Sequence, residues 1–210
     1  AGSGMAKILE SLGVDVVVSG GQTMNPSTKD LLDAVERVNA DAVIILPNNS
    51  NIIMAAQSAA GLSEVPCAVV PTKSVPQAFS ALFSADETAS LEENVENMTS
   101  AFADTKTGEV TTAIKDSKDA HDNPIHNGDV IGIADGSIEA VGSSVEDVVM
   151  SLLDTMEAED ADTLTLLAGE DFSDEQLDAL VERIESRFDE LEIDAHRGEQ
   201  PLYPIVFSVE

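Results

Sequence analysis

Cysteine, aromatic residues and basic residues are all scarce in this sequence. Its 210 residues include one cysteine, one tyrosine, six phenylalanines and no tryptophan. A single cysteine cannot form an internal disulfide. Cys67 lies in the apolar run VPCAVV, where we expect a small buried strand residue. A nucleophilic thiol would need a base and an electropositive setting, and the neighbouring sequence offers neither.

Basic residues are far outnumbered by acidic ones. There are 10 Lys and Arg against 40 Asp and Glu, which gives a formal net charge of −30. This excess argues against binding to nucleic acid, which needs Lys and Arg to neutralise phosphates, and against anionic membranes. Residues 1–85 carry 7 acidic and 4 basic side chains, whereas residues 86–210 carry 33 and 6. Composition leaves open both a solvated acidic face and a docking surface for a basic partner.

Long apolar runs are also missing. None approaches the roughly 20 residues of a membrane-spanning helix, and no basic, apolar-cored signal opens the chain. We therefore expect a cytoplasmic protein without membrane insertion. The hydrophobic content of 43% is enough for a core in one domain or two small ones.

The first part of the chain alternates apolar runs with helical patterns. Strands buried on both faces are predicted at residues 14–18, 41–46 and 66–70. Helices are predicted from Thr28, over 51–62 and from Pro76. This alternation predicts a parallel sheet with right-handed crossovers.

The pattern changes near residue 86. Helices are predicted over 90–102, 144–156 and 173–188, the first and last opened by capping boxes. Strands are predicted at 107–114, 162–169, 191–196 and 203–209, with a polar loop at 115–129 and a hairpin over 129–142. The hairpin indicates a mixed sheet. We therefore predict an α/β fold of two lobes, a parallel α/β lobe over residues 1–86 and an acidic mixed-sheet α/β lobe over residues 87–210.

Polar loops follow the three predicted strands of the first lobe. They are SGGQTMNPS (19–27), PNNSN (47–51) and PTKS (71–74). Ligands of open parallel sheets sit beyond the carboxyl ends of the strands, so these loops predict a rim that could hold a carboxylate or phosphate. The candidate ligand-binding residues are Ser19, Gly20, Gly21, Gln22, Asn25, Asn48, Asn49 and Thr72. The alternative is that they serve only as turn and cap residues.

No catalytic set emerges from the motifs. The sequence contains no P-loop, no G-x-G-x-x-G and no G-x-S-x-G. His121, Asp122 and His126 could bind a metal, but they lie in a polar loop and we interpret them as solvated. His196 has no obvious partner and is interpreted as a strand-end residue. We therefore expect no catalytic residue, metal or cofactor in this chain.

Six segments together resemble a known family, in order and over nearly the whole chain. They are GVDVVVSGGQTMNPSTKDLLDAV, ADAVIILPNNSNIIMAA, VVPTKSVPQAFSAL, KTGEVTTAIKDS, NGDVIGIADGSI and GEQPLYPIVFSVE. They are similar to the C-terminal region of the fatty acid kinase A subunit, often labelled a dihydroxyacetone-kinase-like (DhaL, DAK2) or DAK phosphatase protein. The loop DSKDAHDNPIH fits that family pattern least well.

The resemblance implies a division of labour within a larger polypeptide. ATP and magnesium would belong to an N-terminal kinase domain, and catalytic Cys and His to a central dimerising domain, neither of which is in this chain. The C-terminal region would consist of two lobes with a DegV-like fold. The kinase phosphorylates a fatty acid held in a separate B subunit, and the acyl phosphate feeds phospholipid synthesis. The resemblance implies that this region docks the B subunit by pairing its acidic surface with a basic one.

Three hypotheses follow for this chain. The favoured one is a non-catalytic docking module, with Glu170, Asp171, Asp174 and Glu175 as expected partner-binding residues because they follow a strand and open a helix. The second is a module that binds a fatty acid or other small anion at the polar rim. The third, a hydrolase as the phosphatase label suggests, lacks a nucleophile–base pair and a metal set.

Overall fold

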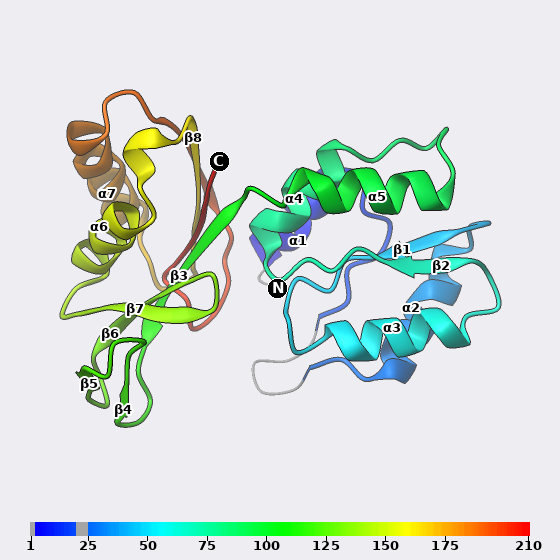
Figure 1. Cartoon of the computed structure of the whole chain (residues 1–210), viewed down its shortest axis with the longest axis horizontal. Coiled ribbons are helices and arrows are strands. Elements are labelled where there is room, and N and C mark those ends of the chain that lie inside the picture. Colours follow the sequence, from blue (N-terminus) through cyan, green and yellow to red (C-terminus); the bar gives the residue numbers. More distant parts are fainter. Residues whose placement is uncertain (1–2, 20–24) are drawn as a thin grey trace. The chain divides into compact units, whose positions relative to one another are not determined.

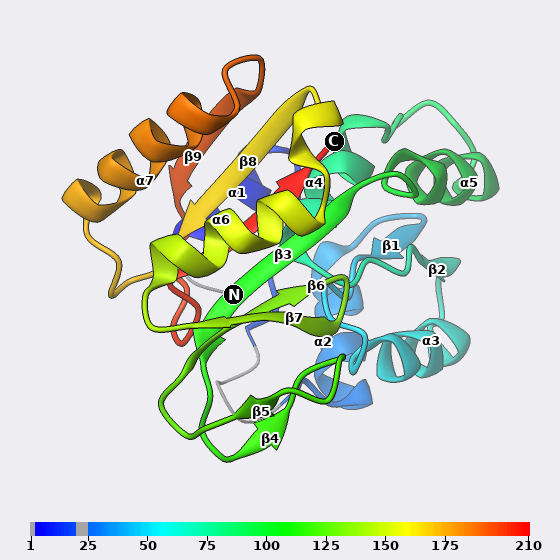
Figure 2. The same cartoon turned by 60° about the vertical axis from the view of Figure 1, so that its left-hand side comes forward.

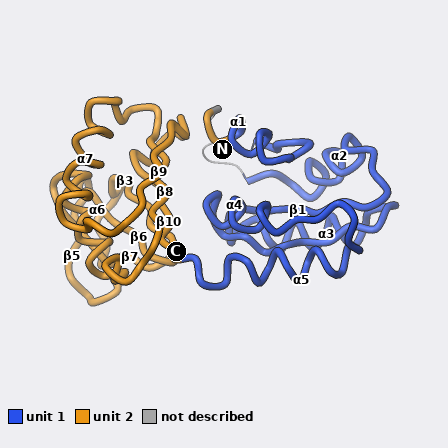
Figure 3. The backbone as a smooth tube through the Cα atoms, turned by 90° about the horizontal axis from the view of Figure 1, so that it is seen from above, with its two compact units in different colours: residues 1, 6–105 blue, residues 2–5, 106–210 orange. Residues whose placement is uncertain are grey.

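The chain divides into two compact units. The structure is a computed structural model that describes residues 3–19 and 25–210 (Figure 1). The first unit holds residues 6–105, and the second holds residues 106–210 with the start of helix α1 (Ser3–Ser11), up to Met5 (Figure 3). The division falls after Thr105 and not at residue 86, because helix α5 (Leu91–Ala101) packs in the first unit, where Met98 shares an apolar cluster with Val70.

The first unit has three layers around two parallel strands. Strand β1 (Val43–Ile45) pairs in parallel with β2 (Cys67–Val69). Helices α2 (Thr28–Val38) and α3 (Ile53–Leu62) cover one face, and α4 (Val75–Phe83) and α5 cover the other (Figure 1). The clusters that bury the two faces contain Leu31, Ala56 and Ala59 on one side, and Val70, Ala81 and Met98 on the other.

The strand predicted at residues 14–18 is wrong. This segment has no regular secondary structure and belongs to no sheet of the described chain. Val16, Val17 and Val18 are half-buried, and Val18 packs against the cluster around Leu31. The apolar pattern therefore reflects burial alone, because a strand also needs backbone hydrogen bonds to a neighbour.

The second unit is a six-stranded mixed sheet with helices α6 (Val145–Thr155) and α7 (Asp174–Arg187) on one face (Figure 2). The strand order is β7-β6-β3-β10-β8-β9, and of these neighbours only β8 and β9 run parallel. The strands are β3 (Lys106–Thr112), β6 (Val130–Ala134), β7 (Ser137–Gly142), β8 (Thr163–Ala168), β9 (Glu192–Arg197) and β10 (Ile205–Val209). The core lies under the helices and includes Val110, Leu152, Leu166, Leu180 and Phe207, all fully buried.

Local signals in the second half of the chain act as predicted. Ser90 with Glu93 and Ser173 with Gln176 make both hydrogen bonds of a capping box. The β6–β7 hairpin turns at Asp135-Gly136. The polar loop at 115–129 differs from prediction, because it contains a small antiparallel sheet of β4 (Ser117–Lys118) and β5 (Pro124–Ile125). Of the described helices, none is long and apolar enough to cross a membrane.

Candidate functional site

The carboxyl ends of β1 and β2 bring two of the candidate rim residues together. Asn48 N donates to Thr72 Oγ1 at 3.0 Å, and Thr72 Oγ1 donates to Asn48 Oδ1 at 2.7 Å. Thr72 is fully buried, and Asn48 has a left-handed backbone with φ of 59°. The two side chains therefore satisfy each other and tie one loop to the other.

The other rim residues are placed less closely together. Asn49 accepts from Asn51 N at 2.8 Å, which is a turn hydrogen bond within its own loop. Ser19 and Asn25 are exposed. Gly20, Gly21 and Gln22 lie outside the described residues. The structure thus brings Asn48 and Thr72 together, and the role of the rim stays a prediction.

Two further polar residues follow β2 that the sequence analysis missed. Ser74 caps α4 by accepting from Gln77 N at 3.3 Å, and Gln77 Oε1 accepts from Lys73 N at 2.8 Å. Ser74 and Gln77 are both buried. The signal was available, because a serine three residues before glutamine at a helix start predicts a capping motif.

The residues considered for metal or catalytic roles are dispersed. His121 Nε2 lies 2.8 Å from Glu139 Oε2, and His126 Nδ1 lies 3.6 Å from Asp129 Oδ2. Across residues 3–19 and 25–210, no group of three or more His, Cys, Asp or Glu side chains is arranged to hold a metal ion. His196 does have a partner, contrary to the interpretation above, since its Nε2 lies 2.9 Å from Asp194 Oδ2.

Cys67 lies in β2 and is half-buried. Burial raises the pKa of its thiol. A raised pKa lowers the fraction of nucleophilic thiolate at neutral pH. The thiol therefore lacks the activation that a catalytic cysteine needs.

The four expected partner-binding residues lie between β8 and the first turn of α7. Glu170, Asp171, Asp174 and Glu175 are all exposed. Ser173 caps α7, so Asp174 and Glu175 occupy the first turn, where acidic side chains are favoured. We call residues 169–175 the acidic loop.

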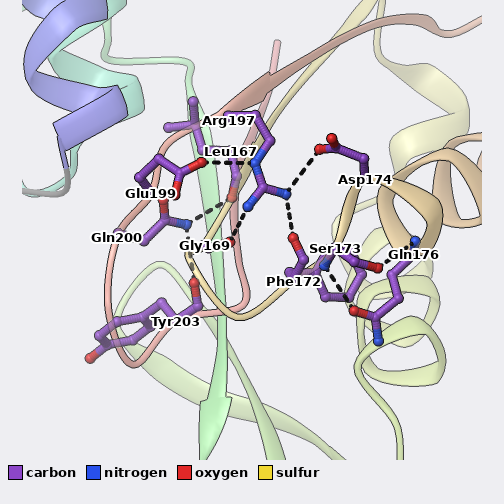
Figure 4. A network of polar contacts seen from close by, with 10 residues as sticks. All are labelled: Leu167, Gly169, Phe172, Ser173, Asp174, Gln176, Arg197, Glu199, Gln200 and Tyr203. Atoms are coloured by element: carbon purple, nitrogen blue, oxygen red, sulfur yellow. Dashed lines mark hydrogen bonds and ion pairs between the residues drawn. The ribbon is translucent and has the colours of Figure 1, made fainter.

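Arg197, at the end of β9, holds the acidic loop from the inside (Figure 4). Its guanidinium donates to the carbonyl oxygens of Phe172 and Gly169, the latter at 2.9 Å. It also lies 3.4 Å from Asp174 Oδ1 and donates to Glu199 Oε1 at 3.0 Å. A single arginine thus joins both ends of the acidic loop to the sheet.

The loop after β9 completes this arrangement, and we call residues 198–204 the β9–β10 loop. Gln200 is buried and donates to Leu167 O at 2.8 Å and Tyr203 O at 3.1 Å (Figure 4). A Cβ on Gly169 would lie 2.4 Å from Tyr203 O, so only glycine allows the two loops to approach this closely. The sequence analysis missed Arg197 and Gln200, because their partners are backbone carbonyls distant in sequence.

The exposed side of α7 carries a row of acidic side chains. The two arginines of α7 face α6: Arg183 Nη1 lies 2.9 Å from Asp147 Oδ1, and Arg187 Nη2 lies 3.1 Å from Asp154 Oδ1. The Arg183 guanidinium lowers the pKa of the Asp147 carboxyl. Spacings of three and four residues place further acids on one other side of the helix. This acidic row, exposed and without an ion pair within the described chain, is Glu175, Asp178, Glu182 and Glu185.

A surface cavity of about 200 Å³ lies elsewhere in the second unit, between the 3-10 helix η1 (Ala158–Asp160) and the end of α7. Its lining includes the polar side chains of Glu159 and Arg187 and the apolar Leu191. Small-molecule sites usually enclose roughly 300–1,000 Å³ and are mostly apolar. This cavity therefore gives no support to a lipid site.

Solved structures with a similar fold place the chain among DegV-like proteins. A DegV family protein of Corynebacterium glutamicum superposes with a TM-score of 0.66 at 15% identity, over 97% of this chain and 92% of that one. The fatty acid kinase B3 protein of Streptococcus pneumoniae, solved with linoleic acid, gives 0.62 at 16% identity, over 88% and 76%. At such identities the likeness shows the fold alone, and it confirms the predicted fold class.

Sequence relatives identify the family. Protein YloV of Bacillus subtilis (strain 168) is 43% identical over 210 residues, which are 100% of this chain and 38% of that protein. The chain thus spans well under half the length of such relatives. The family of C-terminal regions like that of the fatty acid kinase A subunit matches residues 1–210. The chain belongs to this family of fatty acid kinase C-terminal regions.

Proposed function

We propose that this chain is a non-catalytic region of a two-component fatty acid kinase that docks the fatty-acid-carrying B subunit through an acidic surface. Family membership supports a role in this kinase system. Acyl phosphate formation with ATP and magnesium, and its use in phospholipid synthesis, would belong to the rest of the full-length protein. Its dihydroxyacetone-kinase-like character and its cytoplasmic location stay predictions.

The observation that carries the proposal is the unmatched acidic charge of the second unit. The acidic loop and the acidic row are exposed, and both arginines of α7 are engaged with α6. A surface of one sign attracts a partner of the opposite sign and sets encounter rate and specificity more than affinity. A basic surface on the carrier would meet these requirements.

Titration of the chain with its cognate carrier at two salt concentrations tests the proposal. The Debye length falls from about 10 Å at 0.1 M salt to about 3 Å at 1 M. We therefore expect the association constant, measured by calorimetry, to fall as salt rises. Equal affinity at both concentrations would count against docking by charge.

Charge reversal within the acidic surface gives the sharper version. Asp174→Lys with Glu175→Lys should weaken carrier binding about tenfold or more, a change of about 1.4 kcal/mol. The matched control, Asp41→Lys with Glu64→Lys, makes the same change of net charge at exposed positions of the first unit. Equal losses in both variants would assign the effect to total charge and not to this surface.

The second candidate function is binding of a fatty acid or another small anion at the rim of the first unit. The convergence of Asn48 and Thr72 at the ends of two parallel strands favours it. Their mutual hydrogen bonds count against it, because a ligand would have to replace them. Denaturing mass spectrometry of the purified protein would detect a bound lipid.

A further inference from the structure

The β9–β10 loop presents an exposed leucine in an unusual backbone conformation. Leu202 has φ of 68°, and 57% of its surface is exposed. The left-handed region costs a non-glycine residue roughly 1–2 kcal/mol, and Gly, Asn or Asp normally occupies it. An apolar side chain that is neither buried nor suited to its backbone contributes little to folding. Outliers of this kind are a reason to look for a function.

The conformation of Leu202 is held from several sides. Thr111 Oγ1 donates to Leu202 O at 2.6 Å, and Tyr203 N donates to Pro201 O at 2.8 Å. The side chain of Gln200, itself buried, donates to Tyr203 O. The loop therefore presents Leu202 in an ordered form, so a partner would lose little entropy by ordering it further.

The same loop borders the acidic loop. Gly169 N donates to Pro204 O at 2.8 Å, and Glu170 N donates to Gln200 O at 3.0 Å. Arg197 reaches across from the start of the β9–β10 loop to the carbonyls of Gly169 and Phe172 (Figure 4). An exposed apolar residue beside a charged rim is the composition typical of a protein–protein interface.

We propose that Leu202 is the apolar anchor of the docking surface, and that it enters an apolar pocket bordered by basic residues on the carrier. This inference rests on the proposed function and adds a residue and a binding mode to it. The neighbouring acids decide the choice of partner, because a second copy of this chain would bring two acidic loops together. In this arrangement the acids speed the encounter, and Leu202 slows dissociation.

Leu202→Asn separates binding from folding. Asparagine has a similar size, tolerates a positive φ and removes the apolar surface, so the melting temperature should stay equal or rise. Dissociation of the carrier, followed by surface plasmon resonance, should become about tenfold faster, as expected for the loss of a buried apolar contact. Leu202→Met keeps the apolar surface and should bind as the unmodified chain does.

The control is Leu62→Asn, which removes a leucine with 67% of its surface exposed at the end of α3 in the first unit. It should leave the carrier kinetics unchanged. If the carrier binds Leu202→Asn as tightly as the unmodified chain, the anchor is overturned and the proposed function stands. If no carrier binds the unmodified chain at low salt, the proposed function itself fails. Self-association that Leu202→Asn abolishes, seen by sedimentation, would overturn the choice of partner.

Discussion

Glu109 is the acidic side chain whose environment differs most from water. It lies in β3, between Val206 of β10 and Ile133 of β6, and it is largely buried. Burial raises the pKa of its carboxyl. The pKa of Tyr203 is raised by burial and, to a lesser degree, by the charge of Glu109. An ionised Glu109 is therefore a cost to the folded state at neutral pH.

Replacement of Glu109 by glutamine should stabilise the chain in a pH-dependent way. An acid whose pKa is higher in the folded state destabilises the fold when both states are ionised. Glu109→Gln should therefore raise the free energy of unfolding at pH 7. The gain should shrink as the pH falls through the raised pKa towards 4.5, the ordinary value.

Urea unfolding of both proteins at several pH values measures this difference. Subtracting one protein from the other cancels the many other acids that titrate in the same range. A difference that stays constant with pH would show that the gain comes from packing and not from the charge.

At the residue scale, the sequence predicted local contacts and missed distant ones. The capping boxes of α5 and α7 could be read because each pairs residues three positions apart. The contacts of Arg197 and Gln200 could not, because their carbonyl partners lie about 25 to 33 positions away and carry no side-chain signal. The pairing of Asn48 with Thr72 falls between these cases, since parallel strands bring their carboxyl ends together.

Among the elements, α7 carries a conflict between its own stability and its charge. Glu182 has Asp178 four residues before it and Glu185 three residues after it, all exposed. Like charges at these spacings destabilise a helix, and opposite charges stabilise it by roughly 0.2–0.5 kcal/mol per pair. Glu182→Lys should therefore raise the free energy of unfolding by about 0.5–1 kcal/mol while weakening carrier binding.

Glu96→Lys in α5 provides a matched control, because Glu92 and Glu93 stand four and three residues before it. The change of charge and the gain in helix stability should be similar. Thermal unfolding and carrier titration of the two variants separate the effects. Weaker binding by both variants would mean that the acidic row has no special part in docking.

At the element scale, most helices and strands followed from residue pattern. Periodic apolar residues and serine caps gave α5, α6 and α7, and Asp135-Gly136 gave the hairpin turn. Residues 14–18 misled because a buried β-branched run need not pair with a strand. The short strands β4 and β5 had no detectable pattern, since two residues are too few to show alternation.

For the whole molecule, the net charge of −30 predicts opposite responses of folding and docking to salt. Self-repulsion destabilises a compact, highly charged chain, and salt screens it. Raising NaCl from about 0.01 M to 0.15 M shortens the Debye length from about 30 Å to about 8 Å. The melting temperature should therefore rise over the range in which carrier affinity falls.

Differential scanning calorimetry measures the first response, with sucrose at matched osmolality as an uncharged control. A chain of this size gains about 2–4 °C for each kcal/mol of added stability. A melting temperature that falls with NaCl would show that the native ion pairs outweigh the repulsion.

The division into two units was harder to predict than the fold class. Composition changes near residue 86, where the acidic excess begins. The compact units divide after Thr105, because Met98 of α5 completes the apolar cluster of α4 and β2. Charge records what faces the solvent, whereas packing decides which unit a helix belongs to.

The position of β10 bears on how the second unit is made in the cell. Residues 205–209 form a strand between β3 and β8, and among the described strands no other joins these two parts of the sheet. A chain emerging from the ribosome therefore exposes the apolar faces of two half-sheets until β10 has left the exit tunnel. Folding of this unit would have to wait for that moment, and chaperones would meet the half-sheets in the interval.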